Sequence, residues 1–546
     1  MRRDRDIHDS SPNNDFFEEE ITQTEAAEIF SRLLGEPDHS DNETALQRLG
    51  SLIDLSEMLN RPDGLEKALK MGDALFSRDL NASQTAVLHY FLSNAWEAKR
   101  QFTHEGSAIY DWEQPELEKE IVHLRNAVQL SIEAKVEPIR LCQMHTNLGN
   151  LLSHCGRIVD AIASWDSALA IDPDFAMAVG NRGYGIMHYA KLLHDPGHQV
   201  CHFQEAFAGL SHALSPSNAK SLFPEALAGF SGALDQLKRA IPLEVLTAPP
   251  QTLLFPDNMQ TEERRYRTWC LNVRLFLNDL NDLGADPIAA ADVLTVPSIV
   301  TPIKAPQPNA FGFFNQMKQE YVSGRYLYYE GVTADQVHFS DQEVTLINTL
   351  DYPAYGLAVE KIKLAFRIGY SLLDKVAYFL NDYLALGIPE KRVSFRGLWY
   401  NGQKPKQGLR KDMHRPDNAP LKGLFFLAKD LYEKEQGFTD AMEPDAREVA
   451  VIRNHLEHKY FKLHTFSRPR SPSNGDCPIG FDTLAYSMDR RDFERRTLRL
   501  LRIAREALIY VSQVVHVEEN RRRTEATEER LTMPVHMTTW EDRWKS

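Results

Sequence analysis

Three side chains around residue 455 combine the functional groups that RNA phosphodiester cleavage requires. Arg453, Asn454 and His458 bring a guanidinium, a carboxamide and an imidazole into six residues. Histidine can take up or release a proton near neutral pH, as the 2′-hydroxyl and the leaving oxygen need. The arginine fork can hold the phosphate as negative charge builds on it. Asn454 can orient either the phosphate or the imidazole. The sequence therefore predicts these three residues as catalytic.

The segment that carries these groups, Asp445 to Leu463, has the pattern of an amphipathic helix with a buried apolar stripe. On such a helix Asn454 and His458 are neighbours one turn apart, whereas Arg453 lies to one side and reaches them through its long side chain. His455 points away from Arg453. We therefore expect His455 to be a structural or dimer-face residue.

The spacing alone is weak evidence, because an arginine followed five residues later by a histidine occurs three times: Arg3/His8, Arg140/His145 and Arg453/His458. The first lies in a polar leader and the second begins a repeat helix. An Arg453–Glu457 ion pair, with His458 in a helix contact, would also account for the third.

The chemistry calls for no metal and no cofactor. Neither a carboxylate cluster nor a Cys/His group at metal-ligand spacing accompanies the trio. Attack by the 2′-oxygen of RNA would leave a cyclic phosphate end and would make DNA a poor substrate. We expect Lys459, Lys462 and Arg396 to contact the RNA.

Four helices should form a C-terminal bundle with two long connections. They are expected at Tyr355–Leu386, Leu421–Lys434, Asp445–Leu463 and Arg490 to Glu519. Lys429 and Asp430 are charges within an apolar helix, where an internal salt bridge or a solvated edge is favoured over a role at the site. The arginines of the fourth helix spread around it and could attract RNA phosphates, but Glu494 and Glu506 favour a solvated face; they are Arg490, Arg491, Arg495, Arg496, Arg499, Arg502 and Arg505.

The preceding half of the chain has helical repeats. From Cys142 to Pro173, small residues at Gly149, Ala161 and Ala168 alternate with large ones at the spacing of a 34-residue helix–turn–helix unit. This spacing resembles the tetratricopeptide repeat. A second unit begins at Gly183, and 83–100 with 118–135 form another helix pair, so we expect a short superhelical array.

The run EVAVIRNHLEHKYFKL, preceded by KGLFFLAKDLYEK and KIKLAFRIGYSLLDKVAYFLNDYLAL, resembles the HEPN domain, in a bacterial branch joined to tetratricopeptide-like repeats. The resemblance covers about Tyr355–Glu519 and extends to FNQMKQEYVSGRYLYYEG upstream. HEPN ribonucleases carry an arginine, a polar residue, three variable positions and a histidine, which fall on Arg453, Asn454 and His458. The resemblance implies a dimer in which two such motifs form one RNA-cutting cleft, and a role in defence or growth arrest. Some HEPN domains only bind or dimerise.

The predicted fold is thus all-α, with a tetratricopeptide-like repeat array followed by a HEPN-type four-helix bundle. The expected divisions are a flexible acidic leader (1–44), the repeats (45–241), a connecting region with helices (242–349), the bundle (350–520) and a tail (521–546). Two functions fit this organisation. One is a ribonuclease regulated by its repeats, with a protein or peptide trigger; the other is a non-catalytic scaffold whose bundle dimerises or binds RNA.

Charge and cysteine usage agree with an RNA partner and a reducing compartment. Counting from Tyr355, 34 Lys and Arg stand against 27 Asp and Glu, so the remaining chain holds 28 basic and 50 acidic residues. An acidic N-terminal part and a basic C-terminal part suggest that the C-terminal part binds a polyanion. The five scattered cysteines form no C-x-x-C pair and indicate the cytoplasm. No apolar run approaches the ~18–20 residues of a membrane helix, so no membrane partner is expected.

Overall fold

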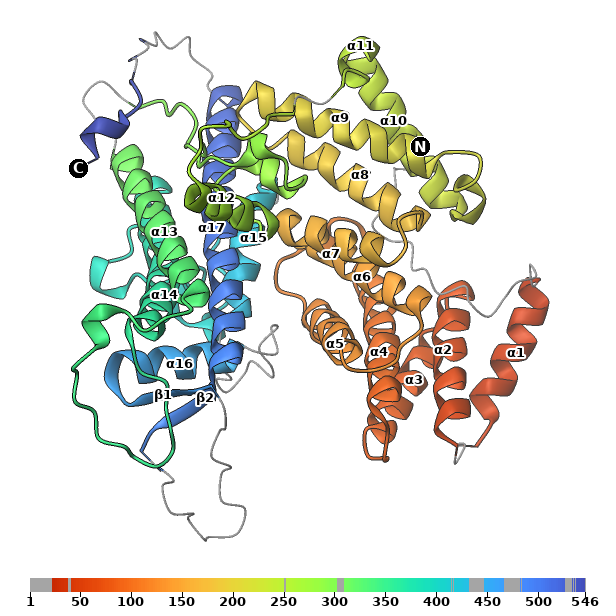
Figure 1. Cartoon of the computed structure of the whole chain (residues 1–546). Coiled ribbons are helices and arrows are strands. Elements are labelled where there is room, and N and C mark those ends of the chain that lie inside the picture. The colour runs from red at the N-terminus through yellow and green to blue at the C-terminus, as the bar shows by residue number, and fades with distance from the viewer. Residues whose placement is uncertain are drawn as a thin grey trace.

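The structure is a computed structural model that describes residues 22–37, 41–249, 252–301, 309–413, 415, 417–431, 446–465, 482, 484–525, 533, 535 and 537–545. Most of the predicted leader and the end of the predicted second bundle helix lie outside the described residues. The predicted all-α class is confirmed, because helices dominate and a single two-stranded sheet accompanies them in the described ranges (Figure 1).

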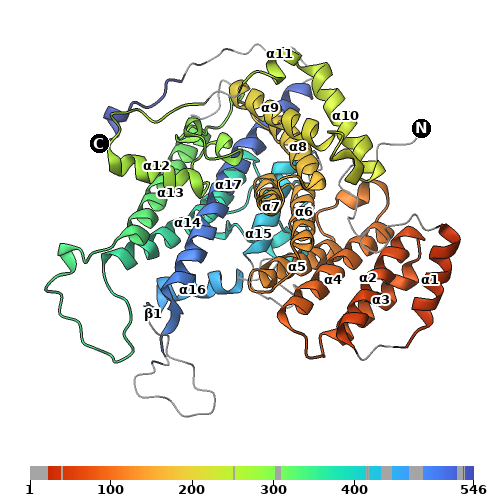
Figure 2. The same ribbon diagram turned by 45° about the vertical axis from the view of Figure 1, so that its right-hand side comes forward.

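Helices α1 to α10 form the N-terminal part. Their bounds are α1 Gln23–Gly35, α2 Asn42–Met58, α3 Pro62–Leu75, α4 Ala82–Thr103, α5 Pro115–Ser131, α6 Pro138–His154, α7 Ile158–Ile171, α8 Ala176–Ala190, α9 Pro196–Ala213 and α10 Pro224–Ala240. Consecutive helices pack as pairs, as Figure 2 shows for α4 with α5 and α8 with α9. Helix α1 lies within the segment that the sequence predicted to be a flexible leader.

The predicted helix–turn–helix unit is present as α6 and α7. A Cβ at Gly149 of α6 would lie 2.4 Å from Nε1 of Trp165 on α7, so only glycine lets the two helices approach this closely. The buried Trp165 also donates from Nε1 to Oδ1 of Asn150 at 3.0 Å. Helix α7 ends two residues before Pro173, as its sequence predicted.

The rest of the chain supplies α11 Leu243–Leu246, α12 Thr261–Asn272, α13 Asn309–Thr333, α14 Leu357–Tyr383, α15 Ala419–Asp430, α16 Ala446–His458, β1 Phe461–His464, β2 Tyr486–Asp489 and α17 Arg490–Thr524. Short 3₁₀ turns occur at 106–110, 219–221, 279–282, 287–289, 339–341, 390–392, 401–403, 405–407 and 542–544. Among the described helices, none is long and apolar enough to cross a membrane.

The bundle is organised around the buried helices α14 and α17, and α13 of the connecting region packs along both (Figure 1). Gly324 and Gly331 of α13 face α14, where added Cβ atoms would lie 2.8 Å from Ile368 Cγ2 and 2.5 Å from Ile362 Cγ1. The Tyr328 hydroxyl donates to the Glu494 carbonyl of α17 at 3.0 Å. Helix α13 of the connecting region is therefore packed against the bundle.

The predicted helix from Asp445 to Leu463 was too long. Helix α16 ends at His458, and Phe461–His464 form β1, which pairs in parallel with β2. Residues 461–464 alternate between apolar and polar side chains, which is the period of a strand. Lys462 and His464 both contact Asp351, through Nζ at 2.6 Å from Oδ2 and through Nδ1 at 3.0 Å from the carbonyl.

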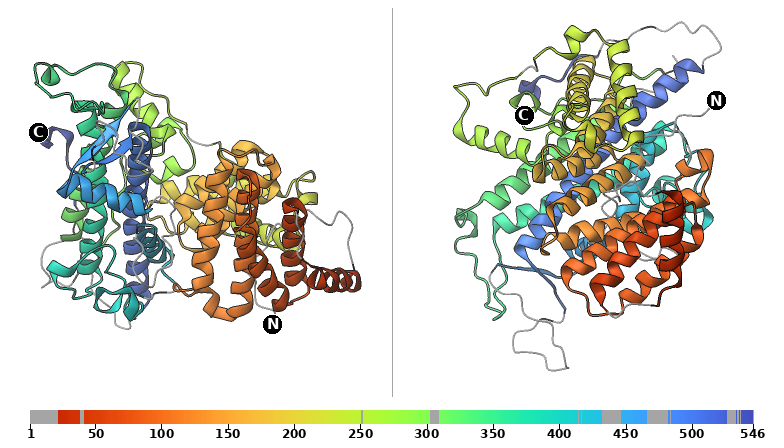
Figure 3. Two further views of the ribbon diagram at one scale, coloured as in Figure 1. Left: turned by 90° about the horizontal axis from the view of Figure 1, so that it is seen from below. Right: turned by 90° about the vertical axis from the view of Figure 1, so that its right-hand side faces the viewer.

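A buried ionic cluster joins the repeats to the bundle. Arg157, which follows α6, pairs with Asp430 of α15 and lies 3.2 Å from Glu506 Oε2 of α17. Arg125 of α5 holds the other oxygen of Asp430 at 2.6 Å, and Lys429 pairs with Glu118. Lys429 and Asp430 thus form internal salt bridges, one of the two alternatives that the sequence favoured, with partners in the repeats. Figure 3 shows the repeat helices in orange beside the cyan and blue helices of the bundle.

The expected solvated face of arginines on the fourth helix was wrong for Arg496 and Arg505, which are buried. Arg505 donates from Nη1 to Oδ1 of Asp282 at 2.6 Å, and Arg499 contacts both oxygens of Asp160 at 3.1 Å. The arginines are spread around α17 because acidic partners from other parts of the chain lie on more than one side of this helix. A buried arginine needs such a partner, since an unpaired charge in the interior is costly.

Gly156 brings the backbone of the repeats close to the start of α15. Its φ is +76°, and a Cβ there would lie 2.1 Å from the Ala419 carbonyl oxygen at the start of α15. On the facing helix, a Cβ at Gly423 would lie 2.5 Å from the Gly156 carbonyl oxygen. The two backbones can approach this closely here only because both positions lack a side chain.

We predict that Gly156→Ala lowers the stability of the chain by at least ~2 kcal/mol, because it combines a left-handed φ with a backbone clash. Thermal unfolding of the full chain measures the effect. Gly232→Ala is the matched control, since that exposed helical glycine has no atom within 4 Å of an added Cβ and should gain up to about 1 kcal/mol. Equal thermal unfolding midpoints for Gly156→Ala and Gly232→Ala would contradict the close approach of Gly156 to α15.

Candidate functional site

Helix α16 shows the predicted trio on its accessible side. Its buried stripe consists of Val449, Ile452 and Leu456, which face the bundle. Arg453 is half-buried, whereas Asn454 and His458 are exposed. The Arg453 Nη1 donates to the Asn454 Oδ1 at 3.3 Å. His458 is the last residue of the helix, one turn after Asn454, so the helical geometry places the imidazole next to the carboxamide.

Helix α14 positions Arg453 and the end of α16. The Arg453 guanidinium lies over the Tyr370 ring, 5.5 Å from its centre, where a cation is attracted to the aromatic face. One turn earlier on α14, Arg367 donates to the Leu456 carbonyl, one of the last carbonyls of α16. This contact satisfies an acceptor that has no partner within the helix.

Glu457 pairs with Arg367, whose Nε lies 3.3 Å from its Oε1. Within the part of the chain that the structure describes, no ion pair joins Arg453 to Glu457, although the i,i+4 spacing would permit one. The ion pair with Glu457 that could have explained the position of Arg453 is therefore not formed. Arg453 instead points its guanidinium toward Asn454 and Tyr370.

His455 lies on the packed side of α16. Its Nδ1 is 2.8 Å from the Val451 carbonyl oxygen, and its ring centre is 5.1 Å from that of Tyr486 on β2. Tyr486 in turn stacks on Phe461 of β1, with ring centres 6.0 Å apart. His455 thus links α16 to the small sheet, as expected for a structural residue.

The three residues expected to contact RNA lie in different surroundings. Lys459 directly follows His458 and is exposed. Lys462 is buried, with Nζ 2.6 Å from Oδ2 of Asp351 and 3.0 Å from Oδ2 of Asp482. These two carboxylates raise the pKa of Lys462 against the opposite effect of burial. The charge of Lys462 is therefore used within the fold, which corrects its expected role.

Arg396 is half-buried and lies near the Tyr400 hydroxyl. Burial, together with the charges of Glu113 and Glu118 from the repeat side, raises the pKa of Tyr400, and Arg396 opposes that effect. Arg396 therefore belongs to the boundary with the repeats. Of the three expected contacts, only Lys459 is an exposed cation beside the trio.

Sequence reasoning missed Arg367 as a residue that positions the site. Tyr370 lies within the long apolar run of α14, which concealed its contact with Arg453. Arg367 is three residues before Tyr370, so both side chains reach the same neighbour from one face of α14. The sequence feature that could have identified Arg367 as a positioning residue is its place as a cation next to an otherwise apolar stripe.

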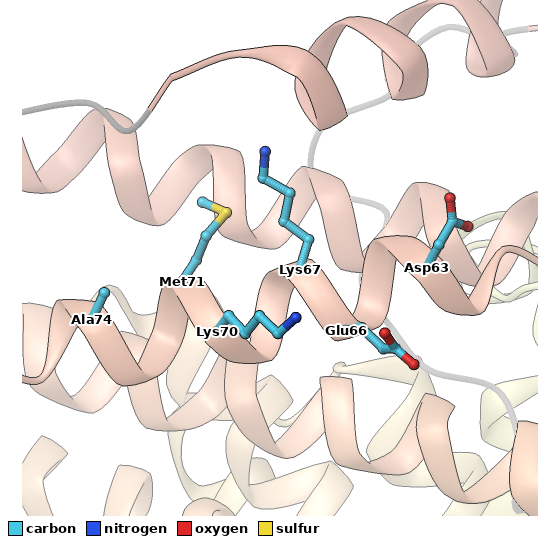
Figure 4. A pocket seen from close by; sticks show the side chains of 6 residues that line it. All are labelled: Asp63, Glu66, Lys67, Lys70, Met71 and Ala74. Carbon is cyan, nitrogen blue, oxygen red and sulfur yellow. The ribbon is translucent and has the colours of Figure 1, made fainter.

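The other features of the described residues do not add to this site. A groove of about 350 Å³ is lined by Asp63, Glu66, Lys67, Lys70, Met71 and Ala74, all on α3 of the repeats (Figure 4). No group of three or more His, Cys, Asp or Glu side chains is placed to hold a metal ion in the described part of the chain.

Comparison with known families supports the resemblance. Residues 303–518 match the family model described as LA2681-like HEPN, so this part of the chain is similar to HEPN domains of that kind. The match begins upstream of α13 and includes α14 to most of α17, with the whole trio inside it. Domains of this class point to RNase-type or RNA-binding functions. No curated protein and no solved structure matched the chain.

We predict that Arg367→Gln loosens the last turn of α16. The substitution removes a charge-assisted hydrogen bond worth ~1.5–3 kcal/mol, so amide hydrogen exchange in 453–459 should accelerate about tenfold or more. Arg61→Gln, which removes an exposed pair with Asp63, is the control and should leave that peptide unchanged. Unchanged exchange in Arg367→Gln would show that the contact does not hold the helix end.

Proposed function

We propose that this protein is a metal-independent endoribonuclease that cuts RNA by transesterification. The 2′-hydroxyl oxygen attacks the adjacent phosphorus while a histidine imidazole takes its proton. The bond from phosphorus to the 5′-oxygen breaks, and that oxygen receives a proton from an imidazolium. The products are a 2′,3′-cyclic phosphate and a 5′-hydroxyl, so the protons balance without a co-reactant.

The observation that carries this proposal is the placement of the trio within the matched HEPN region. Asn454 and His458 are exposed one turn apart on α16, and Arg453 lies beside them over Tyr370. In this arrangement Arg453 would bind the phosphate, Asn454 would orient it, and His458 would transfer protons. Lys459 adds a positive charge at the same helix end.

We further propose that two copies form one active site. The reaction needs a base at the 2′-oxygen and an acid at the 5′-oxygen, and one α16 offers a single accessible histidine at the trio. HEPN domains typically dimerise. Two helices α16 facing each other would supply one His458 on each side of the scissile phosphate, and both arginines would contact it.

The repeats regulate this site in our proposal, through α15. The buried cluster at Asp430 lies at the C-terminal end of α15, on the chain path to α16. A trigger that moves the repeats would therefore displace α15 directly. A protein or peptide trigger on the repeats, with RNA cleavage in defence or growth arrest, fits this arrangement.

Arg453→Ala and His458→Ala should each lower the rate of RNA cleavage by about 10²–10⁴-fold, because each removes one transition-state contact or proton transfer. His212→Ala and Arg61→Ala, at exposed positions in the repeats, are the controls. Cleavage should persist in EDTA, and the product ends should be 2′,3′-cyclic phosphates. A purified dimer that binds RNA but leaves it intact would support the scaffold function instead, as would full cellular activity of both variants.

Asp430→Asn should raise cleavage in the absence of a trigger. It removes a fully buried charge that pairs with both Arg125 and Arg157, and it thereby weakens the contact between repeats and α15. Asp412→Asn, which removes a more exposed pair with Arg410, should leave activity unchanged. If Asp430→Asn remains folded and cleaves at the wild-type rate, the repeats do not act through this cluster.

A further inference from the structure

The connection between α13 and α14 exposes an unusual number of apolar side chains. Helices α13 and α14 pack against each other, yet residues 334–356 link them where a far shorter loop would serve. Monomeric proteins rarely expose contiguous apolar surface of this kind, and such patches mark interaction sites. The exposed apolar residues are Val337 (72%), Phe339 (77%), Val344 (57%), Leu346 (58%), Ile347 (81%), Leu350 (58%), Tyr352 (66%) and Tyr355 (50%).

Residues 342–350, which we call the arm, are held at both ends. On one side, Oδ2 of Asp341 accepts a hydrogen bond from the Leu357 N–H at the start of α14, at 2.8 Å. On the other side, the Ala354 N–H donates to the Leu463 carbonyl of β1 at 2.7 Å, and Asp351 pairs with Lys462. The arm is therefore a fixed projection beside β1 (Figure 1).

The arm itself is irregular, with a strained residue at each end of its central stretch. Val344–Thr349 have no regular secondary structure, and none of their backbone groups bonds to another backbone group in the described residues. Glu343 and Leu350, which bracket this stretch, have φ values of 61° and 65°. A leucine in the left-handed region costs of order 1–3 kcal/mol and persists where surrounding contacts enforce it. Leu350 is 58% exposed, and its N–H donates to Oδ1 of Asn348 at 2.8 Å, so its apolar side chain remains available to a second copy.

The small sheet offers a matching edge. Pro353 bridges to His464 on one side of β1, and β2 pairs on the other side, so the outer edge of β2 faces away from the root of the arm. Within the described residues no strand pairs with that outer edge. Leu484, just before β2, is 78% exposed, and Arg491, just after it, is also exposed.

We propose that the arm of one copy adds to the outer edge of β2 in a second copy, as an antiparallel strand. In this direction Glu343 at the start of the arm meets Arg491, in the first turn of α17 just after β2, and Leu350 meets Leu484 just before β2. Backbone hydrogen bonds and apolar contacts are thereby satisfied together. The exchange is reciprocal, as a two-fold dimer requires.

This inference rests on the proposed function in one respect, because it names what holds two copies of α16 together. The sheet begins three residues after His458, so arms that cross at β2 bring the two trios to the same end of the assembly. The arm and the trio remain separate surfaces. Dimerisation and cleavage can therefore be tested independently.

Sedimentation of the full chain over a range of concentrations tests the proposal. The wild type should be a dimer, and both Ile347→Asp in the arm and Leu484→Asp beside β2 should raise the dimer dissociation constant at least ~100-fold. Leu254→Asp, at another exposed leucine (92%), is the matched control and should leave the constant unchanged. Glu343→Arg should weaken the dimer several-fold, and adding Arg491→Glu should restore it.

A wild type that stays monomeric, or arm variants that dimerise like the wild type, would overturn the inference. The two proposals fail differently. Normal arm-dependent dimerisation without RNA cleavage would refute the ribonuclease alone. If the variants Ile347→Asp, Leu484→Asp and the Glu343/Arg491 exchange still dimerise normally and cleave RNA, only the proposed contact of the arm is refuted.

Discussion

The packing of α16 against α14 is the contact on which the candidate site depends. One face of this short helix must be apolar enough to hold it on the bundle, while the other must expose polar groups to a substrate. Val449, Ile452 and Leu456 meet the first requirement, and Asn454 and His458 meet the second. A helix of this length is marginal alone, so its position comes from tertiary contacts. Arg367 and Tyr370 supply the polar part of that support.

The repeats and the bundle are joined by charges that neither part could bury alone. Burial, followed by the charge of Asp160, raises the pKa of Glu506 well above its usual range. Burial alone would also raise the pKa of Asp160, but Arg157 and Arg499 hold it well below. The repeat residues thus complete the interior of the bundle, which makes their position relevant to the site.

Much of the organisation could be predicted from the sequence, because helix periodicity and turn residues act locally. Gly149 and Trp165 identified a helix pair, and the trio was placed on the correct helix. The end of α16 could not be predicted, because the strand after it depends on Asp351, more than a hundred residues away. The same limit explains why the burial of Lys462, Arg496 and Arg505 was not predicted. The partner of a charged residue is evident from the fold, but it can seldom be predicted from the sequence.

The central claim is that two copies build one cleft, and a mixed dimer tests it directly. A heterodimer of wild-type and His458→Ala subunits, purified through two different tags, contains one intact trio. Our account predicts that its RNA cleavage falls at least ~100-fold below the wild-type dimer, since one proton transfer is lost. A heterodimer with half the wild-type activity would show two independent sites and would contradict the composite cleft.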